Sequence, residues 1–173
     1  MVHAGGAEVY HDPMSSSQQA GVIPPAGNSQ QQARDLHVEF FSRPGYLAII
    51  RQMVDAFSGR LGFAPAEASR ICLAVDEALC NVIRHGYDSS PDGRIWLTIN
   101  EPTDDHCIEF IIEDRAQQVD LDTIRSRNLE DIRPGGLGVH LIGEIMDSVN
   151  YEHRDGGGMR LTMRKRIPGE ETN

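Results

Sequence analysis

The chain has 173 residues, with 16 Lys and Arg against 26 Asp and Glu, so its formal net charge is −10. This length is enough for one domain with a sizeable core plus a tail. The acidic balance argues against nucleic acid or an anionic membrane as the main partner. There is no apolar run of membrane-spanning length and no recognisable signal peptide, and the three cysteines have neither metal-ligand spacing nor an even count. We therefore expect a cytoplasmic protein with free thiols.

The N-terminal part of the chain changes character near residue 35. Residues 1–34 are rich in Ser, Gln, Gly, Pro and Ala, which predicts a disordered tail. Residues 36–40 then alternate between apolar and polar side chains, which is typical of a strand. Ser42 is expected to cap a helix, with Pro44 in its first turn. Apolar residues at helical spacing from Leu47 to Leu61 continue that helix.

The second helix is predicted to open at residues 64–67 and to contain the most informative stretch, residues 71–87. Its apolar residues recur three and four positions apart, so they form one side of the helix: Ile71, Val75, Ala78, Leu79 and Val82. Gly86 is expected to end the helix in the left-handed conformation.

Three polar residues share another side of this helix. Glu77, Asn81 and His85 are each four positions apart, so their side chains lie about one helical turn from one another along the same side of the helix. A carboxylate can take a proton, an amide oxygen can hold a hard cation, and an imidazole can hydrogen-bond a ligand. The alternative is an ordinary solvated face, in which His85 only packs against the helix end.

The second half of the chain predicts strands around one glycine-rich segment. Residues 95–99 and 108–112 alternate as a hairpin that ends at the acids Glu113 and Asp114. A long, partly helical connection is expected over residues 119–133. Gly135, Gly136, Gly138 and Val139 then open an apolar helix over residues 140–146, and residues 149–152 and 159–164 form two final strands. A glycine cluster at a helix start offers backbone N–H groups to a phosphate, although many such clusters are only turns.

These features together resemble one family of ATP-binding domains. The run Asp76 to Tyr87, the acidic strand end and the glycine cluster follow the order seen in gyrase B, heat-shock chaperones, sensor histidine kinases and mismatch-repair ATPases. Within that superfamily, the chain is most similar to the small bacterial anti-sigma-factor serine kinases. The resemblance covers residues 36–166. It implies an α+β two-layer sandwich, with a mixed, mostly antiparallel sheet and about three helices on one face.

The resemblance also implies a function and a site. The expected function is an ATP-dependent serine/threonine protein kinase and anti-sigma factor that phosphorylates an anti-sigma-factor antagonist, with the sigma factor and the antagonist as partners and a possible homodimer. ATP and Mg²⁺ are the expected cofactors, with no direct nucleic acid and no membrane. The implied residues are Glu77 as general base, Asn81 as magnesium ligand, Asp114 as adenine anchor, Gly135, Gly136, Gly138 and Val139 in the phosphate-binding lid, His85 as a ligand contact, and Arg43 as a partner contact.

The sequence departs from the family pattern at three places. Ala116 stands where the family has a glycine, Gln117 and Gln118 replace a glycine-rich continuation, and Met159 stands where a threonine is common. These departures predict a weaker adenine pocket, and they favour an alternative function, a nucleotide-dependent module that sequesters a partner without phosphorylating it. The predicted domain runs over residues 35–167, followed by a C-terminal tail over residues 168–173.

Overall fold

A computed structural model describes residues 36–101, 106–121 and 137–169 of the chain. The predicted tail over residues 1–34, Gly135 and Gly136, and most of the connection over residues 119–133 lie outside these described residues.

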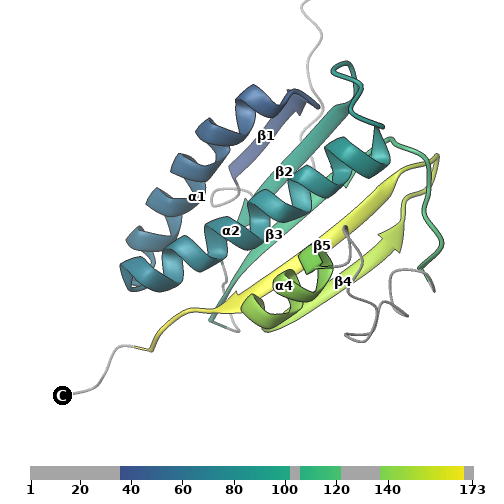
Figure 1. Cartoon of the computed structure of the whole chain (residues 1–173). Helices are drawn as coiled ribbons and strands as arrows, with labels where there is room; N and C mark the ends of the chain where they lie inside the picture. Colours follow the sequence, from purple (N-terminus) through teal and green to yellow (C-terminus); the bar gives the residue numbers. More distant parts are fainter. Residues whose placement is uncertain (1–35, 102–105, 122–136, 170–173) are drawn as a thin grey trace, which may run out of the picture.

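The described strands form one sheet (Figure 1). The strand order is β1-β2-β3-β5-β4, and all four neighbouring pairs are antiparallel. The bounds are β1 Leu36–Phe41, β2 Arg94–Asn100, β3 Cys107–Asp114, β4 Ser148–His153 and β5 Met159–Arg166. The predicted α+β class is therefore confirmed, with a sheet that is antiparallel throughout the described strands.

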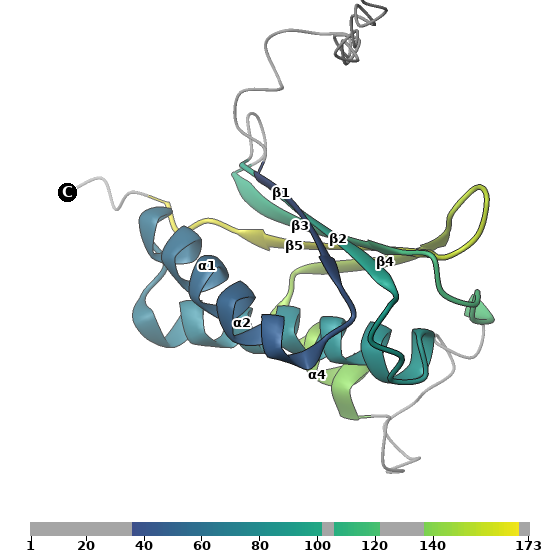
Figure 2. The same ribbon diagram turned by 90° about the horizontal axis from the view of Figure 1, so that it is seen from above.

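The helices cover one face of this sheet, as Figure 2 shows from above. Their bounds are η1 Pro44–Tyr46, α1 Leu47–Arg60, α2 Pro65–Asn81, η2 Val82–Gly86 and α4 Leu137–Ile145. Pro44 begins the single 3₁₀ turn η1, where its fixed φ suits a helix start and its missing N–H costs nothing. The two-layer sandwich with α1, α2 and α4 on one face thus matches the prediction.

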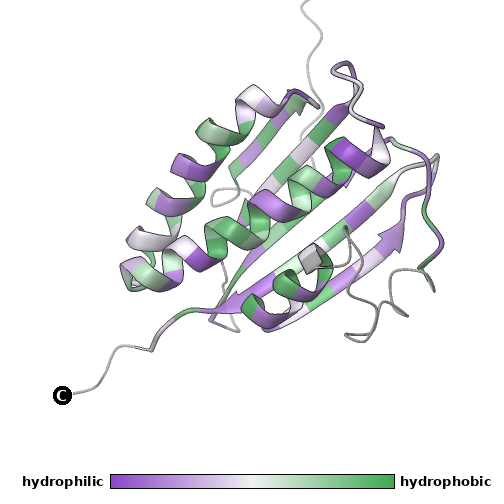
Figure 3. Cartoon of the chain, viewed as in Figure 1, coloured by the Kyte–Doolittle hydropathy of each residue, from purple (hydrophilic) through white to green (hydrophobic). Residues whose placement is uncertain are grey.

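The core lies between the helices and the inward face of the sheet. Ile95, Leu97 and Ile99 alternate along β2 and are fully buried, while the residues between them are only half-buried. The apolar positions of α1 and α2 face these strands, which Figure 3 shows as the green sides of the ribbons. The apolar residues that recur with a period of 2 in the strands therefore pack against those that recur with a period of 3.6 in the helices, and together they form one apolar layer.

Ser42 does not cap a helix, contrary to the sequence prediction. Its side chain is completely buried, donates a hydrogen bond to the carbonyl of Ser90, and accepts one from the N–H of Gly93 at 2.9 Å. The cap position of η1 is Arg43, which makes no side-chain cap bond. Ser42 instead fastens the end of β1 to the turn before β2.

Gly86 does not end the helix in the left-handed conformation either. Helix α2 is regular through Asn81 and then widens into the π-turn η2, and the positive φ angles come later, at Asp88 (48°) and Ser89 (62°). A Cβ atom on Gly86 would lie 2.9 Å from the Cβ of Ala116. Glycine is therefore needed here for a close approach between the helix end and the chain after β3, and not for its φ.

Candidate functional site

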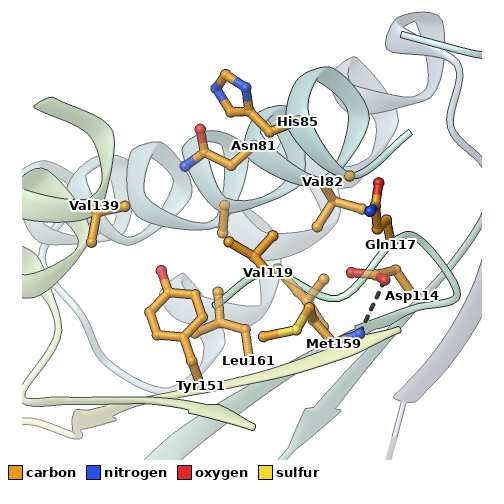
Figure 4. Close-up of a pocket in the computed structure, with 13 residues that line it drawn as sticks. Asn81, Val82, His85, Asp114, Gln117, Val119, Val139, Tyr151, Met159 and Leu161 are labelled. Carbon is orange, nitrogen blue, oxygen red and sulfur yellow. Dashed lines mark hydrogen bonds between the residues drawn. The ribbon is translucent and has the colours of Figure 1, made fainter. Parts of the chain in front are cut away.

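A cavity of about 110 Å³, partly open to solvent, lies between the C-terminal end of α2 and the strands β3 and β5 (Figure 4). Most of its lining is apolar, as is usual for small-molecule sites. The apolar side chains are Ala78, Val82, Ile112, Val119, Val139, Met159 and Leu161. The polar ones are Asn81, His85, Asp114, Gln117 and Tyr151. An apolar slot with a few polar groups suits a ligand with a flat, mostly apolar body.

Asp114 is the most deeply buried of the polar groups and is only 3% exposed. Its Oδ1 accepts hydrogen bonds from the N–H groups of Ala116, at 2.8 Å, and Met159, at 3.1 Å. Burial raises the pKa of this carboxyl, and the two backbone N–H groups act in the opposite direction. Among the described residues, Oδ2 has no hydrogen-bond partner, so it can accept a bond from a ligand in the cavity.

Asn81 and His85 line the same cavity from the helix side. Figure 4 shows Asn81 projecting toward the side of Val139, at the opposite end of the view from Asp114. His85 is exposed at the rim rather than packed against the helix end. Within the described part of the chain, neither side chain has a hydrogen-bond partner. The widening of the helix into a π-turn directly after Asn81 is a feature often found at functional sites.

Glu77 lies one turn before Asn81 and is half-buried, but it is not part of the cavity lining. Its carboxyl group abuts the backbone of Gly138, because a Cβ atom on Gly138 would lie 2.6 Å from Cδ of Glu77. Gly138 is the second residue of α4, so the carboxylate stands at the positive end of that helix dipole. The spacing in the sequence thus predicted that Glu77 and Asn81 share one side of the helix. The structure shows in addition that the first turn of α4 lies beside Glu77.

A network behind the cavity supports Asp114. Tyr87, which follows η2, donates through its hydroxyl to the carbonyl of Arg94 at 2.5 Å and accepts the N–H of Arg115 at 2.9 Å. Arg154 donates from Nη1 to the main-chain carbonyl of Asp114 at 2.6 Å. The side-chain amide of Gln118 donates to the carbonyl of Arg154 at 3.1 Å. The end of β3 is therefore held by groups from two other segments, the residue after η2 and the residue after β4.

The structure adds residues that the sequence did not predict for the site. Gln117 lines the cavity, whereas Gln118 is used in the supporting network. Tyr151 and Leu161 come from β4 and β5, for which the sequence predicted only two strands and no site residue. Met159 was noted as a departure, and it contributes both a lining side chain and the N–H that Asp114 accepts.

The fold and the cavity place this chain in a known class. Residues 40–165 match the family model of the histidine kinase-like ATPase domain, and the chain belongs to this family of ATP-binding domains. A crystal structure of the RsbU and RsbW domains of a Mycobacterium tuberculosis protein has the same fold, with a TM-score of 0.52 and 17% identity over 77% of this chain and 32% of that chain.

Comparison with curated proteins narrows the class to the RsbW serine-protein kinases. The chain is 31% identical to the serine-protein kinase RsbW of Halalkalibacterium halodurans over 136 residues, which cover 74% of this chain and 80% of that protein. It is 29% identical to the serine-protein kinase RsbW of Oceanobacillus iheyensis over 140 residues, which cover 76% of this chain and 86% of that protein. The resemblance predicted from the residues is thereby confirmed.

Proposed function

We propose that this chain is an ATP-dependent serine-protein kinase that also acts as an anti-sigma factor. The observation that carries the proposal is one cavity with a buried carboxylate at one end and the Asn81 amide at the other, beside the first turn of α4. A nucleotide has a flat base and a charged phosphate chain, and this arrangement suits both.

The base end of the site would be Asp114. Its free Oδ2 accepts a hydrogen bond from the exocyclic amine of adenine, while Oδ1 stays bonded to two backbone N–H groups. Hydrogen bonds to an ionised acceptor are roughly twice as strong as neutral ones. The flat ring would lie among the apolar side chains of Val82, Met159 and Leu161, which line the cavity.

The donor set at the other end suits Mg²⁺ held together with phosphate. Asn81 offers an amide oxygen without a partner in the described chain, and no group of three or more His, Cys, Asp or Glu there could hold a metal ion unaided. Mg²⁺ is usually bound by one or two protein oxygens together with substrate phosphates and waters. When bound, it would neutralise charge on the phosphate chain.

The proposed reaction moves the γ-phosphoryl group of ATP to a serine of a partner. Glu77 takes the proton of the serine hydroxyl, the serine oxygen forms a bond to the γ-phosphorus, and the bond from that phosphorus to the ADP oxygen breaks. Gly138 lets the backbone of α4 approach the Glu77 carboxylate and orient it. Orientation and charge neutralisation supply most of the rate in such transfers.

The lid of the site would be the glycine cluster. Gly135 and Gly136 lie outside the described residues, while Gly138 and Val139 are the second and third residues of α4. Backbone N–H groups at this helix start would hold the phosphate oxygens. His85, exposed at the rim, would donate to the phosphate or ribose.

The proposed partners are a sigma factor and an anti-sigma-factor antagonist that carries the substrate serine, in a partner-switching system. We propose a cytoplasmic location and a homodimer. Within the described residues, no helix is long and apolar enough to cross a membrane.

Arg43 is proposed to contact a protein partner. Its side chain is 51% exposed and is held by the carbonyl of Pro91 at 3.3 Å and by Asp92 at 3.7 Å. A guanidinium restrained in this way loses less conformational freedom when it binds a partner carboxylate. Arg43 is separate from the cavity lining, so the proposal predicts that its role is independent of nucleotide.

A calorimetric titration tests the proposal, with ATP and ADP each added with and without Mg²⁺. A second assay follows transfer of labelled γ-phosphate from ATP to a candidate antagonist. We expect ATP to bind in a Mg²⁺-dependent way and phosphoserine to appear on the antagonist. If neither nucleotide binds, the whole proposal fails. If ATP binds but no phosphate moves, the chain is the nucleotide-dependent sequestering module instead.

A further inference from the structure

Arg154 directly follows β4 and makes three side-chain contacts behind the cavity. Its Nη1 donates to the main-chain carbonyl of Asp114 at 2.6 Å, and its Nε pairs with the Glu113 carboxylate at 3.1 Å. The guanidinium also lies 5.3 Å from the centre of the Trp96 ring. These contacts leave the side chain only 24% exposed. An arginine fixed in this way can hold the end of β3 in one position.

The main chain of Arg154 organises the turn that carries a second bond to Asp114. Its N–H donates to the carbonyl of Gly158 at 3.0 Å, and its carbonyl accepts the N–H of Gly157 at 3.2 Å and the Gln118 amide at 3.1 Å. Met159, which follows Gly158, donates its N–H to Oδ1 of Asp114. The turn therefore bonds both the carbonyl and the carboxyl of Asp114, and Arg154 closes it.

The charge of Arg154 also acts on this carboxyl. Burial raises the pKa of Asp114. The two backbone N–H groups lower this pKa, and the Arg154 guanidinium lowers it by a smaller amount. Among the residues that the structure describes, the other titratable and charged groups around Asp114 are His85 in η2, Tyr87 just after it, Glu113 in β3 and Arg115 just after β3. Of these, Arg115 is the closest match to Arg154, because its guanidinium lies 5.5 Å from the centre of the same Trp96 ring.

We propose that Arg154 is a positioning residue for nucleotide binding, which holds the Asp114 carboxylate in place through its bond to the Asp114 main-chain carbonyl. The proposal rests on the adenine-binding role proposed for Asp114. Arg154 itself is not part of the cavity lining, so it acts through Asp114. The carboxylate is the form that accepts the bond from the adenine amine most strongly.

The test compares Arg154→Gln with Arg115→Gln. Both changes remove one positive charge that stacks on Trp96, but only Arg154 bonds the Asp114 carbonyl. ATP affinity is measured by calorimetry at neutral pH and at several mildly acidic values. We expect Arg154→Gln to weaken ATP binding about tenfold at neutral pH, the size of one lost hydrogen bond to a charged donor. Arg115→Gln should leave ATP affinity unchanged.

The pH profile separates positioning from a general structural role. Removing the guanidinium raises the pKa of Asp114 further, so on acidification ATP affinity should fall at a higher pH in Arg154→Gln than in the wild type. Arg154→Lys keeps the charge, so it should keep the wild-type pH midpoint even where affinity falls. All variants retain His85, so the comparison between variants cancels any contribution of that side chain.

Three outcomes decide the matter. Equal ATP affinity and an equal pH midpoint in Arg154→Gln and Arg115→Gln would overturn the proposal. A lowered melting temperature in both Arg154 variants, with unchanged pH midpoints, would make Arg154 a structural residue only, which also overturns it. If wild type and Asp114→Asn bind ATP equally or not at all, the adenine-binding role of Asp114 has failed instead.

Discussion

Gly158→Ala is the substitution for which the structure gives the sharpest expectation. Gly158 has a φ of +90°, in the turn between β4 and β5. A Cβ atom there would overlap the carbonyl oxygen of Asp114, and would lie 2.7 Å from its carbonyl carbon and 2.8 Å from Cα of Arg115. These are backbone atoms at the end of β3, so they cannot move aside without moving Asp114.

Two costs add in this variant. Holding an L-residue in the left-handed region costs about 1–2 kcal/mol. Overpacking against fixed atoms costs about 1–3 kcal/mol more. The sum is about 2–5 kcal/mol, against a total unfolding free energy on the order of 5–15 kcal/mol for a domain. If the turn shifts to relieve the overlap, Met159 moves with it and the bond from its N–H to Oδ1 of Asp114 is lost.

Gly157→Ala is the matched control. Gly157 has a φ of +100°, yet a Cβ atom there meets nothing within 4 Å, so this variant carries only the backbone cost. Thermal melting and ATP titration are measured on both variants. Gly158→Ala should be less stable than Gly157→Ala by about 1–3 kcal/mol and should bind ATP more weakly. Equal melting temperatures and equal ATP affinities in the two variants would refute the reasoning.

Three further variants test the proposed chemistry and partner surface. Glu77→Gln should retain ATP binding while phosphate transfer falls by ~10²–10⁴-fold, as measured with labelled ATP; a normal transfer rate would remove Glu77 as the base. Asn81→Ala should weaken Mg²⁺-dependent ATP binding, since a hard cation loses an oxygen ligand, and calorimetry that finds the same Mg²⁺ dependence as in the wild type would contradict this. Arg43→Ala should weaken partner binding and leave ATP affinity intact; loss of both in one preparation would indicate misfolding, and loss of neither would leave Arg43 an ordinary surface residue.

Much of the fold could be predicted because its signals are local. Alternation over residues 95–99 and 108–112 predicted the centres of β2 and β3, and the observed strands extend beyond each prediction by only one or two residues at either end. Helical spacing from Leu47 to Leu61 predicted α1 in the same way. A strand buried on one face and a helix buried along one stripe each have apolar residues at a fixed spacing, which can be seen within a short segment of the sequence.

The two incorrect predictions depend on contacts between distant segments. Ser42 was expected to cap a helix because of its neighbours, but its hydroxyl is bonded to residues about 50 positions later, Ser90 and Gly93. Gly86 was expected to supply a left-handed angle, but the position needs glycine because Ala116 comes close. Local propensity cannot predict which distant backbone will approach a residue.

The departures at Ala116 and Met159 have a different meaning in the structure from the one they have in the sequence. In the sequence, they replace a glycine and a threonine of the family pattern, which predicts a weaker adenine pocket. In the fold, both residues hold Asp114 through their backbone N–H groups, which every residue except proline provides. Ala116 is not part of the cavity lining, and its methyl group approaches Gly86. We therefore infer that the geometry of the carboxylate depends on the path of the backbone after β3 and before β5. A substitution that bends this path should affect it more than one that changes either side chain.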